Sequence, residues 1–328
     1  MIISRTPFRI SFFGGGTDYP VWYRENGGVV LSTTIDKYSY LNCRYLPPFF
    51  DNKYKIVWSK IEAVKNIDEI EHPVVREVLK FLNISDGMEI HNSADLPAWS
   101  GMGSSSSFAV GLLNALHTLK GHLPSKEQLA SEAIHIERNV LKEDGGIQDQ
   151  IAVAFGGFNK IIFGGEEEFE VVPLALQKQR IDELQSHLML FFTGTTKMGL
   201  KVAAEQIKNT PKKSTELQKM ASLVTDAEKI LFKNDSIEDF GHLLDETWKL
   251  KRTLADLISN SKIDEIYDKG TKAGALGGKL LGAGGRGFIL FFVKPELQDK
   301  VREALSDLVH VPFKFESSGS QIIHYQPK

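Results

Sequence analysis

A turn rich in glycine and serine, set directly before a helical pattern, is the feature that most constrains this chain. Residues 96–107 read Leu-Pro-Ala-Trp-Ser-Gly-Met-Gly-Ser-Ser-Ser-Ser. Apolar residues then recur at helical spacing, and Gly121 and Pro124 end the pattern. The buried face predicted for this helix consists of Phe108, Leu112, Ala115, Leu116 and Leu119. A flexible turn must therefore sit at the N-terminus of a core helix.

This turn has the chemistry of an anion-binding site. Its glycines let backbone N–H groups approach an anion closely. The first turn of the following helix offers unpaired N–H donors and a partial positive charge. Serine hydroxyls can reach a phosphate oxygen or its magnesium. The alternative is an ordinary turn with Ser104 as helix cap, although a cap needs one serine rather than four.

Composition excludes several functional classes. The formal net charge is −3, so nothing indicates nucleic acid or an anionic membrane as a partner. No apolar run approaches the roughly 18 residues of a membrane span, and the N-terminus lacks a signal-peptide pattern. The single cysteine, Cys43, excludes an intrachain disulfide and a multi-cysteine zinc site, and we expect a packed, inert thiol. These features predict a cytoplasmic protein, and they do not indicate an oligomeric state.

The order of predicted elements indicates an α+β fold of two domains. The polar stretch near residues 175–187 is the expected boundary, which gives domains at 1–180 and 181–328. Strands are expected at 28–46, 54–58, 88–92, 158–163, 188–192 and 287–293, with two short strands at the end of the chain. Helices are expected at 74–82, 125–141, 147–155 and 295–308, with three or four more within 198–276.

Two more glycine-rich loops accompany the serine turn. The first follows an apolar strand and reads Gly14-Gly15-Gly16-Thr17-Asp18. Asp18 there accepts hydrogen bonds either from sugar hydroxyls or from its own loop, as an Asx turn. The later loop, 282–287, matches G-x-G-x-x-G. It precedes an apolar strand instead of opening a helix, so it is not a dinucleotide-binding fingerprint.

Two carboxylates are candidates for chemistry. Glu137 lies near the middle of the apolar arc of helix 125–141, at about 100° per residue. A carboxylate on a buried face is costly without a partner, so it meets a buried arginine or lysine or it coordinates a cation. Asp149 opens a short apolar helix. It is either a helix-start carboxylate favoured by the helix dipole or a site carboxylate.

The three loops together resemble the motifs of the GHMP kinases, the family of galactokinase, homoserine kinase, mevalonate kinase and phosphomevalonate kinase. The resemblance covers essentially the whole chain. It rests on Pro97-x-x-x-Gly101-x-Gly103-Ser104-Ser105-Ser106, on Gly282-Ala283-Gly284-Gly285, and on Asp149 twelve residues after Glu137. The family fold implies an N-terminal domain of ribosomal protein S5 domain 2 type and a ferredoxin-like C-terminal domain, with ATP bound between them.

The resemblance also implies roles for single residues. Asp149 takes the substrate hydroxyl proton, Arg9 neutralises nearby charge, and Ser105 and Glu137 hold magnesium. ATP binding falls to Pro97, Ser100, Gly101, Met102, Gly103, Ser104, Ser105 and Ser106. Substrate binding falls to Gly15, Gly16, Thr17, Asp18, Gly284, Gly285 and Arg286.

Within the family, residues 6–19 are similar to the first loop of bacterial D-glycero-D-manno-heptose 7-phosphate kinases, and residues 192–197 also resemble that branch. Gly15 and Gly16 replace the Glu-His pair of galactokinases. This implies phosphorylation of the anomeric C1 hydroxyl of the heptose phosphate, towards GDP-heptose for capsule or surface polysaccharide. The alternatives are another sugar-1-kinase, of fucose or galactose type, and a non-catalytic sugar-binding regulator. A 7-phosphate needs a cationic pocket, with candidates Lys37, Arg44, Lys197 and Arg286.

Overall fold

Two long strands form the centre of the first sheet in this computed structural model, which describes residues 1–98, 100–194, 199–233 and 236–326. β1 (Ile2–Phe13) and β2 (Gly28–Tyr45) pair antiparallel along most of their length. β2 is rich in β-branched and aromatic residues, which suit a pleated and partly buried surface. Cys43 lies buried in β2, as expected, and burial raises the pKa of its thiol to about 12.

The other strands of this sheet come from both ends of the chain. The order is β13-β1-β2-β5-β3-β4, with β6 and β12 also pairing with β2, and β7 pairing with β6. β3 and β5 run parallel, whereas the other pairs are antiparallel. These strands are β3 (Tyr54–Val57), β4 (Ile61–Val64), β5 (Met88–Ala94), β6 (Phe158–Gly164), β7 (Glu168–Pro173), β12 (Phe315–Glu316) and β13 (Gln321–Tyr325).

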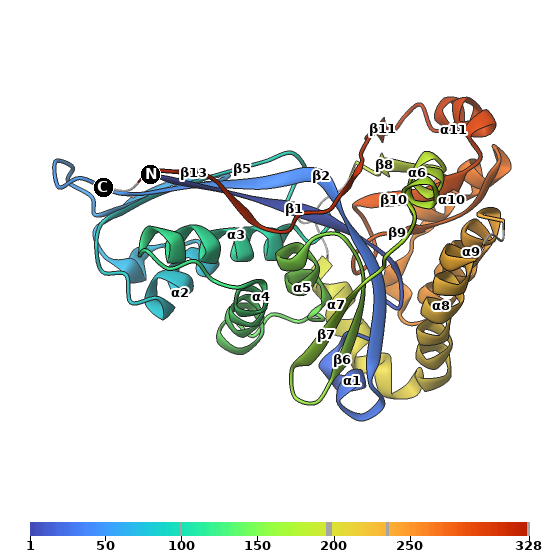
Figure 1. Cartoon of the computed structure of the whole chain (residues 1–328), viewed down its shortest axis with the longest axis horizontal. Helices are drawn as coiled ribbons and strands as arrows, with labels where there is room; N and C mark the ends of the chain where they lie inside the picture. Colours follow the sequence, from blue (N-terminus) through green and yellow to red (C-terminus); the bar gives the residue numbers. More distant parts are fainter. Residues whose placement is uncertain (99, 195–198, 234–235, 327–328) are drawn as a thin grey trace.

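Helices cover one face of this sheet (Figure 1). α3 (Ser104–Leu119) packs on β1 and β2, and its predicted buried face is confirmed, with Leu119 partly buried and the other four residues buried. α4 (Lys126–Ile134) and α5 (Gln148–Phe155) pack on α3 and on each other. The same half of the chain also contains α1 (Pro20–Asn26), η1 (Ile67–Glu69), α2 (Pro73–Phe81) and the π-helix η2 (His135–Val140).

The second sheet has the order β11-β8-β10-β9. Its central strand β10 (Phe288–Val293) is buried throughout and pairs with β8 (Leu188–Phe192) and β9 (Ala275–Leu280). Figure 1 shows α8, α9 and α10 on the flank of this half. The remaining elements are α6 (Lys178–Ser186), α7 (Gly199–Asn209), η3 (Thr210–Lys212), α8 (Ser214–Phe232), α9 (Glu238–Arg252), η4 (Asp256–Ile258), α10 (Ser261–Lys272), η5 (Pro295–Leu297), α11 (Gln298–Ala304) and β11 (Val309–His310).

This arrangement confirms the predicted α+β class, whereas the division near residue 180 stays a prediction. Elements that were not expected from the sequence include α1, β4, β7, α6 and β9. β9 contains Gly277, where a Cβ atom would lie 2.1 Å from the carbonyl oxygen of Gly241 in α9. Close packing of a helix on this strand therefore requires a residue that is a poor strand former. No helix in the described ranges is long and apolar enough to span a membrane.

Contacts at the end of β1 join the two sheets. Phe240 of α9 packs edge-on against Phe12 and Phe13, with ring centroids 5.4 and 5.0 Å apart. Lys279 of β9 donates from Nζ to the carbonyl oxygens of Ser11 at 2.9 Å and Phe12 at 2.7 Å. These contacts fix the loop after β1 next to the loop after β9.

Candidate active site

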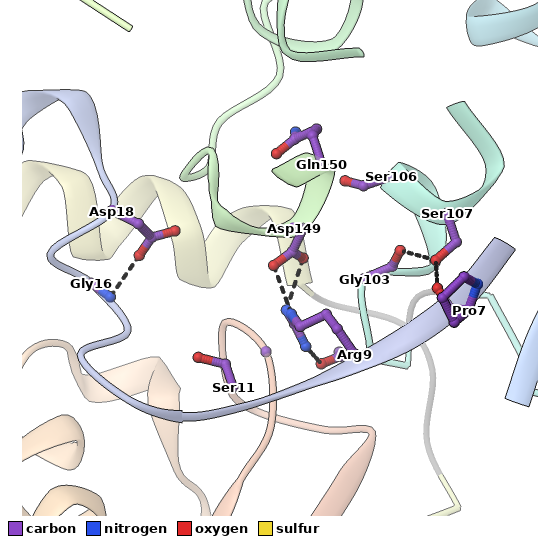
Figure 2. Close-up of polar contacts among 12 residues, drawn as sticks. Pro7, Arg9, Ser11, Gly16, Asp18, Gly103, Ser106, Ser107, Asp149 and Gln150 are labelled. Carbon is purple, nitrogen blue, oxygen red and sulfur yellow. Dashed lines mark hydrogen bonds and ion pairs between the residues drawn. The ribbon is translucent and has the colours of Figure 1, made fainter. Parts of the chain in front are cut away.

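The three glycine-rich loops lie around one cavity, which residues from both halves of the chain line. Figure 2 shows Arg9, Asp18, Asp149 and the start of α3 gathered at this place. Most of the predicted site residues line the cavity: Arg9, Gly15, Gly16, Asp18, Gly101, Gly103, Ser104, Ser105, Ser106, Glu137, Asp149, Gly284 and Arg286.

Five predicted site residues do not line it: Thr17, Pro97, Ser100, Met102 and Gly285. The buried hydroxyl of Thr17 donates to the carbonyl oxygens of Gly14 and Val29, so this side chain braces its own loop. Met102 is buried in the hydrophobic core. The sequence pattern indicated the loops that line the cavity but did not reveal which of their residues lie away from it.

The serine turn presents backbone and hydroxyl groups to the cavity. Gly101 and Gly103 have φ of 78° and 75°, a left-handed conformation that favours glycine. Gly103 is the N-cap of α3, so Ser104 is the first helical residue and the alternative of a serine cap is wrong. Ser107 donates to the carbonyl oxygens of Pro7 and Gly103 at 2.9 Å, which fixes the turn on β1. The serine turn and the N-terminus of α3 together fit a nucleotide phosphate.

Glu137 is buried beside this turn, with 3% of its surface exposed. Its carboxylate accepts hydrogen bonds from Ser105 at 2.8 Å, from Ser106 at 2.9 Å and from the amide of Gln150. Burial raises the pKa of Glu137 to about 7, with the nearby charge of Glu143 adding to the rise and the three hydrogen bonds opposing it. No arginine or lysine of the described ranges forms an ion pair with it, so that alternative is not supported.

The local helix geometry explains where Glu137 lies. Residues 135–140 form a π-helix, a form that often occurs at functional sites. A π turn takes more residues than an α turn, so Glu137 stays on the buried face while the apolar Val140 is 39% exposed. A carboxylate and two hydroxyls offer the hard oxygen ligands that magnesium prefers. This donor set therefore fits a magnesium ion shared with nucleotide phosphates.

Asp149, at the start of α5, forms a two-point ion pair with Arg9 of β1. The distances are 2.7 Å from Nε to Oδ1 and 2.8 Å from Nη2 to Oδ2. Arg9 also donates from Nη1 to the carbonyl oxygen of Gly101 at 2.8 Å (Figure 2). The Arg9 side chain is 4% exposed, whereas that of Asp149 is 27% exposed and faces the cavity. One guanidinium thus ties the carboxylate to the serine turn.

Asp18 lies in the first loop and is 2% exposed. Its Oδ1 accepts the N–H of Gly16 at 2.8 Å, a bond within its own loop, and the residue also lines the cavity. The loop is not an Asx turn, because that turn needs the N–H two residues later, and Pro20 has none. Burial raises the pKa of Asp18, and the charge of Asp149 adds to the rise, while the Gly16 and Gln148 hydrogen bonds lower it. Gln148, next to Asp149, was missed from the sequence, and its buried Oε1 has no hydrogen-bond partner within the described part of the chain.

Two buried lysines that line the cavity were also missed. Lys251 of α9 donates from Nζ to the carbonyl oxygens of Leu280, at 3.2 Å, and Gly282, and burial lowers its pKa to about 7. Lys279 is bound to the end of β1, and burial lowers its pKa well below the usual range. Both contact backbone carbonyls far away in the sequence, so no local pattern indicates them.

Comparison with known proteins identifies the architecture. Residues 61–157 match the family model of the GHMP kinases N terminal domain, and residues 229–310 match that of the GHMP kinases C terminal domain. A D-glycero-alpha-D-manno-heptose 7-phosphate kinase of Campylobacter jejuni is 30% identical over 93% of both chains. A bifunctional fucokinase/GDP-fucose pyrophosphorylase of Arabidopsis thaliana is 26% identical over 92% of this chain and 31% of its own length.

Solved structures agree with this. A D-glycero-D-manno-heptose 1-phosphate kinase from Bacteroides thetaiotaomicron superposes with a TM-score of 0.80 at 26% identity, covering 99% of this chain and 100% of its own. A Lactococcus lactis galactokinase, complexed with galactose, has a TM-score of 0.73 at 19% identity over 98% and 94% of the two chains, and it shows the shared fold.

Proposed function

The chain belongs to the GHMP kinase family, and on that premise we propose that it phosphorylates the anomeric C1 hydroxyl of D-glycero-D-manno-heptose 7-phosphate. Membership makes it an ATP-dependent phosphotransferase. The proposed acceptor is supported by the Campylobacter relative, at 30% identity, and by the similarity of residues 6–19 to that branch. The product is the heptose 1,7-bisphosphate, on the way to GDP-heptose and surface polysaccharide.

The observation that carries this proposal is the ion pair between Arg9 and Asp149 in the cavity. In the proposed reaction Asp149 accepts the proton of the acceptor hydroxyl. Arg9 holds both carboxylate oxygens and also binds the carbonyl of Gly101, so the base and the phosphate loop keep a fixed relation. Phosphoryl transfer depends mainly on such alignment and on charge neutralisation.

The serine turn and Glu137 serve the nucleotide side of the proposed site. Backbone N–H groups of the turn and of the first turn of α3 bind phosphate oxygens. Glu137 and Ser105 are the proposed magnesium ligands, and the hydrogen bond of 2.8 Å between them holds the carboxylate in position for the metal. Magnesium, when bound, offsets the charge on the phosphates. Glu137 then ionises fully, because a nearby cation favours the charged form of a buried carboxylate.

The first loop serves the acceptor side. Asp18 is an acceptor for sugar hydroxyls, and the unpartnered Oε1 of Gln148 beside it is a second one. Gly15 and Gly16 line the cavity without side chains and leave room for the sugar ring. This set of acceptors matches a ligand that is rich in hydroxyl donors.

A coupled ADP-release assay with Mg-ATP tests the function. The panel consists of D-glycero-D-manno-heptose 7-phosphate, the heptose 1-phosphate, sedoheptulose 7-phosphate, mannose, fucose and galactose. We expect selective turnover of the manno-heptose 7-phosphate, with phosphorus NMR showing a new anomeric phosphate. Turnover of an unphosphorylated sugar would show that the proposed acceptor is wrong and would favour a fucose- or galactose-type kinase. ATP binding without turnover of any sugar would favour the non-catalytic regulator.

A further inference from the structure

Arg286, in the loop between β9 and β10, has one unsatisfied guanidinium nitrogen in the cavity. The residue is 7% exposed, and its buried Nη1 has no hydrogen-bond partner among the residues that the structure describes. It lines the same cavity as Asp149 and Asp18. An unpaired, buried N–H of a charged group costs free energy. The unpaired N–H of such a side chain is satisfied by a ligand that accepts hydrogen bonds.

No carboxylate within the described ranges forms an ion pair with Arg286, and burial alone lowers its pKa. Two of the acidic groups of the cavity have other partners. Asp149 is held by Arg9, and Glu137 by Ser105, Ser106 and Gln150. The positive charge of Arg286 therefore needs an anion from outside the chain. Phosphate is the anion whose geometry best matches a guanidinium.

The backbone on both sides of Arg286 is fixed. The N–H of Gly285 donates to the carbonyl of Ile258 at 2.8 Å, and Asn260 donates to the carbonyl of Gly285 at 3.0 Å. A Cβ atom on Gly287 would lie 2.1 Å from the carbonyl oxygen of Ser100, so this glycine lies directly against the serine turn. The guanidinium is thus presented from a braced loop, which is the condition for a specific anchor.

Neighbouring contacts connect this loop to the acceptor side of the cavity. A Cβ atom on Gly285 would lie 3.5 Å from Val202 of α7. One turn further along α7, Gln206 accepts the hydroxyl of Tyr19 at 3.4 Å and lies against Gly16. The same helix therefore supports both the first loop and the Arg286 loop. In the proposed function, the serine turn and the α3 N-terminus bind the nucleotide phosphates.

We propose that Arg286 binds a phosphate carried by the acceptor, at a position remote from the hydroxyl that receives the new phosphoryl group. This inference rests on the proposed function and extends it, because Arg286 becomes the residue that selects sugar phosphates over free sugars. Of the other candidates for a cationic pocket, Lys37 pairs with Asp36 and Arg44 with Glu89, and neither lines the cavity. Lys197 lies outside the described residues.

Isothermal titration calorimetry on Arg286→Gln tests the proposal. The ligands are D-glycero-D-manno-heptose 7-phosphate, the same heptose without phosphate, a non-hydrolysable ATP analogue and ADP. The Kd for the 7-phosphate should rise by roughly 10- to 100-fold, as expected for loss of a charge-assisted hydrogen bond. The Kd values for the free heptose and for both nucleotides should change little. The Kd of Arg286→Lys for the 7-phosphate should lie between the values for wild type and Arg286→Gln, because lysine keeps the charge but lacks the fork of donors.

The control is Arg44→Gln, which removes the same charge outside the cavity and should leave every Kd near the wild-type value. Circular dichroism checks that each variant is folded. If only the ATP analogue bound more weakly, with the Kd values for ADP and the 7-phosphate unchanged, Arg286 would be assigned to the terminal nucleotide phosphate. That result would overturn the acceptor assignment. Unchanged Kd values in Arg286→Gln, with normal turnover, would overturn this inference alone. A wild-type protein that neither binds nor phosphorylates the heptose 7-phosphate would overturn the proposed function and this inference together.

Discussion

Replacing Glu137 by glutamine should make the metal-free protein more stable at alkaline pH. Burial and the charge of Glu143 raise the pKa of Glu137 from 4.5 to about 7. Each pKa unit corresponds to 1.36 kcal/mol, so the rise is equivalent to about 3 kcal/mol. The folded chain holds a proton between these two pH values that the unfolded chain has lost. The contribution of Glu137 to stability is therefore fully present below pH 4.5 and is lost as the pH rises through 7.

Glutamine suits this site because it has no charge at any pH and nearly the same shape. Its amide oxygen can accept from Ser106 and Gln150, and its amide N–H can donate to the hydroxyl of Ser105. No buried group loses its partner, so the substitution removes the charge and little else. We expect the stability gap between Glu137→Gln and wild type to widen by about 2–3 kcal/mol, in favour of the variant, from about pH 5 to about pH 8.5.

Urea denaturation of both proteins across this pH range, in EDTA, measures the gap directly. The difference between the two proteins cancels titrating groups that do not interact with Glu137, such as Asp18. Glu132→Gln is a control of opposite sign, since hydrogen bonds from His117 and Gln128 outweigh burial and lower the pKa of Glu132. That variant should lose stability at neutral pH. A gap for Glu137→Gln that stays constant with pH, or that favours wild type at the alkaline end, would refute the reasoning.

The other predictions concern the reaction and the loops. Glu137→Gln should raise the magnesium concentration needed for half-maximal activity, and a normal magnesium titration would argue against a ligand role. Asp149→Asn should lower kcat by about 10²–10⁴-fold while an ATP analogue still binds, since the proton acceptor is lost together with one of its two contacts to Arg9; unchanged turnover in the coupled assay would leave Asp149 as a helix-start residue. Gly146→Ala would place a Cβ atom 1.7 Å from Oδ2 of Asp18, so calorimetry should show a larger loss for the acceptor than for the nucleotide. Gly145→Ala, which meets nothing within 4 Å, should have a much smaller effect, and similar losses in both variants would contradict this. Burial lowers the pKa of Lys251 from 10.5 to about 7. The free energy of unfolding of wild type should therefore rise relative to that of Lys251→Met as the pH rises from 7 to 10.5. The same pH dependence in both proteins, measured by urea denaturation, would contradict the lowered pKa.

Local patterns predicted those parts of the site that depend on a single segment. The turn before α3 and the buried position of Glu137 follow from helical periodicity and from glycine chemistry within about a dozen residues. The α+β class follows from the order of such segments. Their roles in binding and catalysis remain predictions, because those roles were inferred from resemblance.

Features that depend on distant contacts were not predictable. Lys251 and Lys279 are buried against carbonyl groups that only the folded chain brings to them, and a lysine is otherwise expected to be exposed. Thr17 looked like a ligand residue because of its neighbours, yet its hydroxyl is used by Gly14 and Val29. The exposure of Val140 depends on the π-helix, for which no sequence rule was applied.

The pairing of β13 with β1 has a consequence for how the protein is made. Gln321 lies opposite Arg5, and Thr6 bonds Ser320, so the outer edge of the first strand is closed by residues that leave the ribosome more than 300 positions later. Until then β1 presents unpaired N–H and C=O groups, the kind of edge on which nascent chains aggregate. Contacts across more than 300 residues also make folding slow. The first sheet is therefore completed only after more than 300 further residues have been synthesised, and the outer edge of β1 depends on protection over that interval.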